Sequence, residues 1–243
     1  MSLLIDMALV LSICLLLSVL SYRFGLLTKS GGAASFFVGV VIGVFGSVNW
    51  LILLIAFTLA GFVVTKFRLN MKIERGVQEG RKGERTWKNV LANGLVPALI
   101  AIISWRLDAS RSIEAGIVYL TAISVAASDT VASELGVLSD KAFLITSGVP
   151  VAAGTDGGVS IWGTFWAFMG AVLASSLGWA VIFPGTWPEF SIIIPIFMGF
   201  IGCNIDSLIG ATLERKGLIS KLGTNLSSMA IATTLAVLLL MLF

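Results

Sequence analysis

Long apolar stretches recur along the chain and are separated by short polar ones. A membrane-spanning helix needs about 20 mainly apolar residues, and eight stretches approach or exceed that length. The stretch over 32–48 is short and Gly-rich, which is typical of a tilted or re-entrant segment. We therefore predict an all-α, polytopic transmembrane helical bundle of about eight spans, within a range of six to nine. The predicted spans are 3–22, 32–48, 50–66, 90–106, 112–128, 160–183, 190–205 and 226–243.

The composition agrees with a membrane protein. Of the 243 residues, 57% are hydrophobic and 12% are charged, and a soluble protein of this size could not bury so much apolar surface. The first span carries Asp6 and is not preceded by basic residues, so it resembles a retained helix more than a cleaved signal peptide. We treat 1–243 as a single integral membrane domain, with cytoplasmic loops at about 23–31, 67–89, 129–159 and 206–225.

The basic residues predict the orientation in the membrane. With eight spans and both termini outside, fourteen of the sixteen Lys and Arg residues fall on one side, and Arg106 and Arg111 fall on the other. The positive-inside rule makes the richer side cytoplasmic. All the polar motifs described below share that side. We therefore expect a protein of the cytoplasmic membrane with its active site facing the cytoplasm.

The rarest residue types exclude some chemistries. The chain has no histidine, which excludes a histidine general base and a histidine-ligated zinc site. Cys14 and Cys203 lie inside apolar spans, and we interpret them as small buried thiols. No feature indicates a nucleic-acid partner.

The stretch "ASDTVASELG", residues 127–136, places several polar side chains at the end of an apolar run. In a continuing helix, Asp129 and Ser133 share one face, and Thr130 and Glu134 share an adjacent face. Carboxylates and hydroxyls suit a hard cation such as Mg²⁺. A helix-capping cluster is the structural alternative. An aspartate at the edge of the hydrocarbon region is costly to maintain, which favours a functional site.

A Gly-rich stretch, "VPVAAGTDGGVSIWGT", precedes the sixth predicted span. Glycines let backbone N–H groups point into one concavity, and a helix N-terminus favours anions, so the stretch is a candidate phosphate cradle. It lacks the Gly-Lys-Ser/Thr sequence of a Walker A loop. An ordinary turn with Asp156 or Ser160 as the helix N-cap is the alternative. The candidate nucleotide-binding residues here are Gly154, Thr155, Gly157, Gly158 and Ser160.

A second Asp-hydroxyl pair, Asp206-Ser207, ends the seventh predicted span much as Asp129-Thr130 ends the fifth. Two aspartates that reach one point from two helices could bind one or two divalent ions. The alternative is a buried polar contact between helices.

Two basic stretches provide candidate substrate contacts. Eight Lys or Arg residues lie between positions 66 and 88, where they attract either anionic lipid headgroups or phosphorylated ligands. The stretch at Lys29-Ser30 is either another such contact or a tight hairpin between two spans. From both we select Arg81, Arg85 and Lys88 as candidate catalytic cations, and Lys29, Ser30 and Lys72 as candidate substrate-binding residues. Asn93, at the start of the next apolar span, and Ser207, beside Asp206, are further candidate substrate-binding residues.

Five stretches together resemble one family of integral membrane proteins, which includes the phytyl-phosphate kinases of plants and cyanobacteria. The stretches are "LLTKSGGAASFFVG", "RKGERTWKNVLANG", "ASDTVASELG", "VPVAAGTDGGVSIWGT" and "NIDSLIGATLE". The middle motifs are distantly similar to dolichol and phytol kinases, which use CTP, and "IDSLIGA" is similar to a motif of the CDP-diacylglycerol synthases. The dolichol kinases tend to carry a Lys and a Glu where this chain has "GTDGG". The phosphate-binding cation is therefore unidentified, and we look for it among 66–88.

The resemblance implies a CTP-dependent kinase that converts a prenyl monophosphate, such as phytyl or geranylgeranyl phosphate, to the diphosphate. In this interpretation Asp129 and Asp206 hold Mg²⁺, and the Gly-rich loop holds the nucleotide phosphates. Thr130, Ser133 and Glu134 match the Asp-Thr motif of the kinases and are further candidate nucleotide-binding residues. Membrane lipids are further partners, and a homodimer is compatible with the sequence. A cytidylyltransferase that forms a CDP-lipid, and a transporter without nucleotide chemistry, remain as alternatives.

Overall fold

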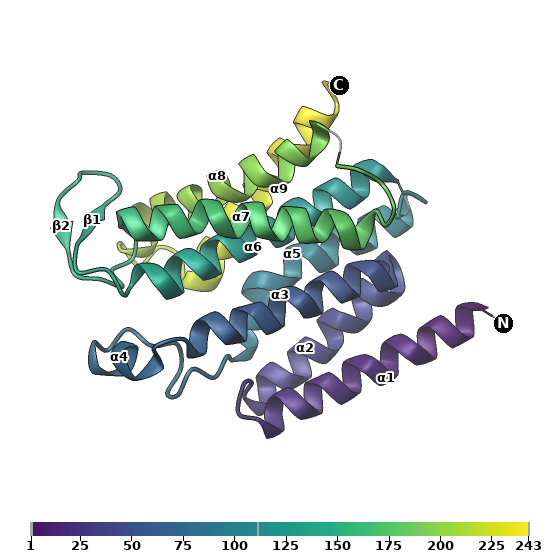
Figure 1. The fold of residues 1–243 in the computed structure, drawn as a ribbon, viewed down its shortest axis with the longest axis horizontal. Coiled ribbons are helices and arrows are strands. Elements are labelled where there is room, and N and C mark those ends of the chain that lie inside the picture. The colour runs from purple at the N-terminus through teal and green to yellow at the C-terminus, as the bar shows by residue number, and fades with distance from the viewer. Residues whose placement is uncertain (1, 111, 189, 243) are drawn as a thin grey trace.

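The structure is a computed structural model and describes residues 2–110, 112–188 and 190–242, so Arg111 lies outside the described residues. Eight of its helical segments are long and apolar enough to cross a membrane, which confirms the predicted polytopic bundle (Figure 1). A short helix, α4, lies outside these spans. The helices are α1 Ser2–Arg23, α2 Lys29–Val41, α3 Val48–Lys66, α4 Leu69–Glu74, α5 Trp87–Arg106, α6 Ile113–Gly136, α7 Ile161–Ile182, α8 Ile193–Ile209 and α9 Lys221–Leu240.

Two helices continue as π-helical turns, and this changes the predicted boundaries. The turn Ile42–Gly46 extends α2 into a full span of 18 residues, and Gly210–Glu214 extends α8. Because α6 continues to Gly136, residues 129–136 are helical and not part of a loop, and the same holds for 206–214. The apolar pattern ends at these positions, but the helices do not, because the polar side chains there find partners inside the bundle.

The helix α6 lies at the centre of the bundle. Its span is 72% buried within the protein, whereas that of α1 is only 11% buried. A glycine of α7 lets that helix approach α6 closely, since a side chain on Gly170 would meet the Ala127 carbonyl oxygen of α6 at 3.1 Å. Serines add polar links between helices, and the Ser128 hydroxyl donates to the Ala167 carbonyl oxygen at 2.8 Å. The polar end of α6 is therefore held firmly in position.

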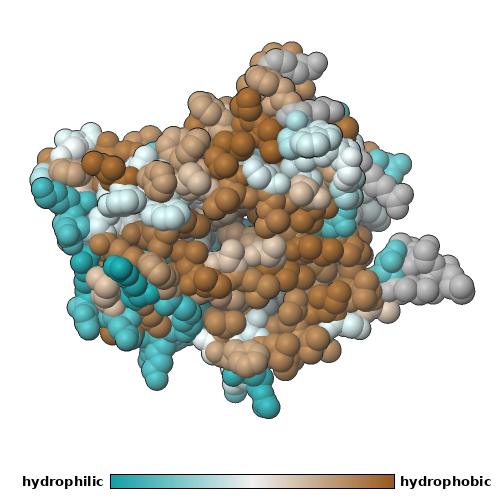
Figure 2. Space-filling view, in the orientation of Figure 1, coloured by the Kyte–Doolittle hydropathy of each residue, from teal (hydrophilic) through white to brown (hydrophobic). Residues whose placement is uncertain are grey.

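A small antiparallel sheet between α6 and α7 was not expected from the sequence. Its strands β1 Ala142–Leu144, β2 Pro150–Val151 and β3 Gly158–Val159 are arranged in the order β2-β1-β3, with Phe143 opposite both Pro150 and Val159. The sheet lies at the same end of the bundle as α4 (Figure 1). Figure 2 shows apolar side chains over the middle of this face and polar ones at the end that carries α4 and the strands.

Candidate active site

A polar cavity of about 400 Å³ opens at this end of the bundle. Its walls come from the ends of α6 and α8, the loop after α4, the Gly-rich loop between β2 and β3, and the start of α9. Most of the motifs selected from the sequence meet there, although they lie far apart in the chain. The predicted site residues that line it are Asp129, Ser133, Glu134, Gly154, Thr155, Gly157, Gly158, Ser160, Asp206 and Ser207.

Two aspartates, Asp129 of α6 and Asp206 of α8, face each other closely enough to interact electrostatically. Each carboxylate is oriented by a side chain of α9. The Asn225 amide donates to Asp129 Oδ2 at 3.2 Å, and the Ser228 hydroxyl donates to Asp206 Oδ1 at 3.1 Å. The interhelical polar contact considered for Asp206 is therefore present. That contact engages only the Oδ1 atom of the Asp206 carboxylate.

These two carboxylates fit a divalent cation such as Mg²⁺. The second oxygen of each has no hydrogen-bond donor among the described residues. Mg²⁺ commonly takes one or two carboxylates and completes its octahedron with water and phosphate oxygens. Within the described part of the chain no group of three or more Asp, Glu, Cys or His residues could hold a metal, so two carboxylates would be the protein's share.

Lys221, the first residue of α9, provides the positive charge of the cavity. It interacts electrostatically with both Asp129 and Asp206, and among the described residues it is the one Lys or Arg in the cavity wall. The sequence pattern does not distinguish Lys221 from the other basic residues, and it predicts the phosphate-binding cation within 66–88. The spacing of Lys221, Asn225 and Ser228 places them on one face of α9, and this polar stripe in an apolar helix was the signal that could have identified them.

The Gly-rich loop lies against the end of α8 and closes one side of the cavity. Gly157 has a φ of +72°, and a side chain there would collide with Ala211 in the π-helical turn. Gly154 has a φ of +81°, and a side chain there would lie 2.9 Å from Val77. These glycines are required both for backbone conformation and for close packing. The backbone is thereby brought to the wall of the cavity, where its N–H groups could bind an anion.

Ser160 ends the loop as the N-cap of α7. Its hydroxyl accepts from the Gly163 N–H at 3.0 Å and also contacts the Ser139 hydroxyl at 3.1 Å. The capping alternative is therefore correct for Ser160. The Ser160 side chain is also 93% buried, which leaves it little access to a ligand.

Lys72 and Glu134 form a buried ion pair at the base of the cavity. Lys72 Nζ donates to Glu134 Oε2 at 2.6 Å, to the Val64 carbonyl at 3.0 Å and to the Thr65 carbonyl at 3.2 Å. The Thr65 hydroxyl donates to Glu134 Oε1 at 2.7 Å. Every proton of the ammonium and both carboxylate oxygens are thus engaged. Both side chains therefore join α3, α4 and α6, while Glu134 also lines the cavity. The substrate-binding role expected of Lys72 and the nucleotide-binding role expected of Glu134 stay predictions.

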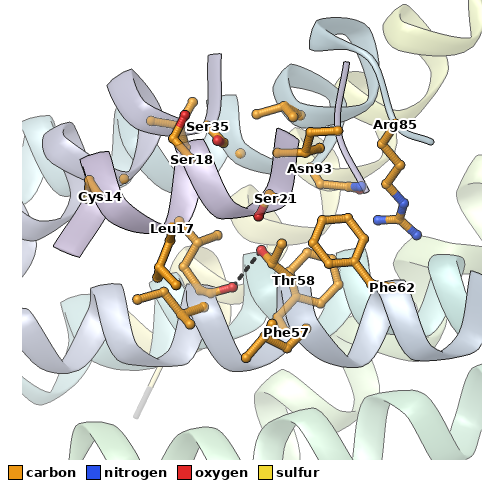
Figure 3. Close-up of a pocket in the computed structure, with 18 of the residues that line it drawn as sticks. Cys14, Leu17, Ser18, Ser21, Ser35, Phe57, Thr58, Phe62, Arg85 and Asn93 are labelled. Atoms are coloured by element: carbon orange, nitrogen blue, oxygen red, sulfur yellow. Dashed lines mark hydrogen bonds between the residues drawn. The ribbon is translucent and has the colours of Figure 1, made fainter. Parts of the chain in front are cut away.

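Arg85 extends this chain of contacts to a second cavity. Its Nη2 donates to the Thr65 hydroxyl at 3.0 Å, while its buried Nε has no acceptor among the described residues. Burial lowers the pKa of the Arg85 guanidinium, and the negative charges of Glu134, Glu79 and Asp129 oppose that shift. Arginine stays protonated in proteins even so. Arg85 and Asn93 line an apolar groove beside the polar cavity (Figure 3).

The remaining predicted residues lie outside both cavities. Lys88 is exposed and its ammonium lies over the Trp87 ring, and Arg81 is exposed in the loop after α4. Lys29 and Ser30 are exposed at the start of α2, in the tight connection that was their structural alternative. Thr130 is buried among the helices. The structure therefore does not bring these five residues to the site: Arg81, Lys88, Lys29, Ser30 and Thr130.

Comparison with known proteins places nearly the whole chain in one family. The model described as "Integral membrane protein DUF92" matches residues 12–238. An uncharacterised membrane protein of Methanocaldococcus jannaschii is 34% identical and aligns over 95% of this chain and 92% of its own length. An uncharacterised membrane protein of Synechocystis is 33% identical, over 79% of this chain and 73% of its own.

A plant relative is also similar. Protein VTE6, chloroplastic, of Arabidopsis thaliana is 31% identical and aligns over 78% of this chain and 57% of its own length. No solved structure matches the chain. The match to the family model and these relatives confirm the family identified from the five motifs.

Proposed function

Since this chain belongs to the integral membrane protein family DUF92, we propose that it is a nucleoside-triphosphate-dependent kinase of a prenyl monophosphate, with CTP as the donor. One observation carries the proposal: Asp129 and Asp206 converge from two helices on a polar cavity that also contains Lys221 and the Gly-rich loop. Carboxylates for a metal, a cation and a backbone loop are the components that phosphoryl transfer requires. The motif resemblance to phytyl-phosphate kinases supplies the substrate class.

In the proposed reaction, an oxygen of the prenyl phosphate attacks the γ-phosphorus of the triphosphate. The bond from that phosphorus to the β–γ bridging oxygen breaks, and the nucleoside diphosphate leaves with the electron pair. The products are a prenyl diphosphate and the nucleoside diphosphate. The acceptor phosphate is already ionised, so the step needs no general base, which suits a chain without histidine.

The residues have separate tasks in this proposal. Asp129 and Asp206 hold Mg²⁺, which would neutralise charge on the donor phosphates when bound. Asn225 and Ser228 keep the two carboxylates aimed into the cavity. Lys221 interacts with the phosphate oxygens as a point charge. The loop from Gly154 to Ser160 packs against the triphosphate through its backbone. The polar end of the bundle, and hence the site, faces the cytoplasm, where nucleotides are available.

The test is an assay of detergent-purified protein with γ-labelled CTP, Mg²⁺ and geranylgeranyl phosphate. We expect the label in a lipid diphosphate. Asp129→Asn should lower kcat/KM by about 100-fold or more, because it removes a charge that stabilises the transition state. Asp140→Asn is the matched control, since the Asp140 side chain is 90% exposed and pairs with Arg75 at the surface.

Three other results would contradict the proposal. Label in pyrophosphate would make the protein a cytidylyltransferase that forms a CDP-lipid. Equal activity of Asp129→Asn and Asp140→Asn would remove Asp129 from the site. An absence of turnover, with no CTP binding by calorimetry, would refute the kinase and leave a transporter as the interpretation to test.

A further inference from the structure

A groove on the membrane side of the polar cavity is built differently from it. It lies between α1, α2, α3 and α5, and its lining is mostly apolar, with a few Ser, Thr and Asn side chains and Arg85 among it. In Figure 3, Leu17 and Cys14 of α1 lie across the groove from Phe57 and Thr58 of α3, and Arg85 lies at one end beside Phe62. An apolar channel that ends in a buried guanidinium is complementary to a molecule with an apolar tail and an anionic head.

The guanidinium at the end of the groove is incompletely satisfied. Arg85 Nη2 donates to Thr65, but its buried Nε–H has no acceptor among the residues described. An unpaired polar atom in a buried site costs free energy, so a ligand that supplies a partner is favoured there. A phosphate provides several oxygens, and arginine binds phosphate in a bidentate manner.

Buried hydrogen bonds connect the groove to the polar cavity. The Thr65 hydroxyl, which is 1% exposed and lines neither cavity, accepts from Arg85 of the groove and donates to Glu134 of the polar cavity. Arg85 also interacts electrostatically with Asp129. An anion bound at Arg85 would thus be coupled electrostatically to the carboxylates of the polar cavity.

The groove is accessible from the lipid phase. The helix α1 packs chiefly against α2 and the π-helical turn that follows it, and most of its surface is free. The open volume is about 110 Å³, whereas a cavity of about 150 Å³ takes up one benzene. The groove therefore encloses only the part of a long tail next to the head, and the remainder extends between α1 and α3 into the membrane.

We propose that this groove binds the isoprenoid phosphate acceptor, with its first isoprene unit between α1 and α3 and its phosphate on Arg85. This inference rests on the proposed function for the identity of the tail. It specifies where the acceptor enters, which is sideways from the bilayer, while the nucleotide enters from water through the polar cavity.

Two tryptophan variants on α1 test the groove. Leu17 points into it, whereas the adjacent Leu16 is 59% exposed and lies outside its lining. Leu17→Trp fills the groove, and we expect the Kd for radiolabelled geranylgeranyl phosphate, measured without nucleotide, to rise about tenfold or more. Leu16→Trp should stay within about twofold. The Tm of both variants, compared with wild type, shows that the bundle is intact.

The outcomes separate this inference from the kinase proposal. Equal binding by the two variants, or no binding by wild type, would overturn the groove assignment. If phosphatidylglycerol displaced the radiolabelled geranylgeranyl phosphate as well as unlabelled geranylgeranyl phosphate does, the groove would be a site for bulk phospholipid. That result would also overturn the groove assignment. Groove-dependent binding without phosphoryl transfer would uphold the inference and refute the kinase. Phosphoryl transfer with the same KM for geranylgeranyl phosphate in both variants would overturn the groove assignment and uphold the kinase.

Discussion

Replacing Lys72 with methionine tests whether its ion pair is structural. The ammonium is fully buried and has three acceptors, of which Glu134 Oε2 is the nearest at 2.6 Å. Methionine occupies a similar volume but supplies no proton. Glu134 then keeps a single hydrogen-bond donor, the Thr65 hydroxyl, and loses its direct ion-pair partner, with Arg85 as the remaining cation that acts on it.

The expected cost follows from that geometry. Removal of one member of a buried ion pair typically costs about 3–5 kcal/mol, because the remaining charge is left without its partner. For a chain of this length the melting temperature should fall by on the order of 10 °C. The double variant Lys72→Met/Glu134→Gln removes the unpaired charge as well, so it should recover part of the loss, with a coupling of about 0.5–3 kcal/mol.

Thermal unfolding in detergent, followed by circular dichroism, measures these differences. Lys66→Met is the matched control, because Lys66 is exposed and its ammonium contacts only the Lys82 carbonyl, at 2.5 Å, among the described residues. It should change stability by about 0.5 kcal/mol or less. A Lys72→Met protein that melts within about 2 °C of wild type but has lost lipid phosphate binding would refute the structural role and restore Lys72 as a ligand.

Three further predictions concern the loops around the site. Gly157→Ala should lower activity sharply in protein that still folds, because its methyl group would collide with Ala211, whereas Gly148→Ala, also at positive φ but with nothing within 4 Å, should cost only about 1–2 kcal/mol in stability and leave activity intact. Equal activities would show that the loop's packing is unimportant. Ser160→Ala should cost about 1 kcal/mol in thermal unfolding through loss of the α7 cap, and Ser160→Asn should recover it. Backbone N–H donors lower the pKa of Glu84, so its loop contacts are fully present above about pH 4 and are lost as the pH falls through the lowered value. The protection factor of the Lys82 amide should therefore be lower in Glu84→Gln than in wild type at neutral pH, and only the wild-type value should fall on acidification.

Much of the fold followed from hydropathy, because lipid imposes a minimum length on every span. The predicted helix ends were wrong where the apolar pattern stops before the helix does. Asp129 interrupts the apolar run of α6, yet the helix continues beyond it, since Asn225 of a distant helix solvates the carboxylate. Such a partner is 96 residues away in the chain, and no local pattern reveals it.

The same reason explains which site residues were identified. Asp129, Asp206 and the Gly-rich loop carry unusual residue types at helix ends, so the sequence alone singled them out, and the structure places them around one cavity. Residue type and position could not separate the basic residues that line the cavity from those that are structural. Lys72 and Lys221 look alike in a sequence, and only the packing shows that one is enclosed by acceptors while the other lines the cavity.

The position of α9 has a consequence for how the protein is made. Membrane helices emerge from synthesis in chain order, N-terminal segments first. Asp129 and Asp206 are already in place on α6 and α8 before Asn225 and Ser228, which aim both carboxylates, and Lys221, which balances their charge, have been synthesised. Until α9 docks, the two like charges lack Lys221 and the side chains that orient them, and Arg85 is the remaining cation that acts on Asp129. Under the proposed function, the site would be complete only once the eighth span has entered the bundle.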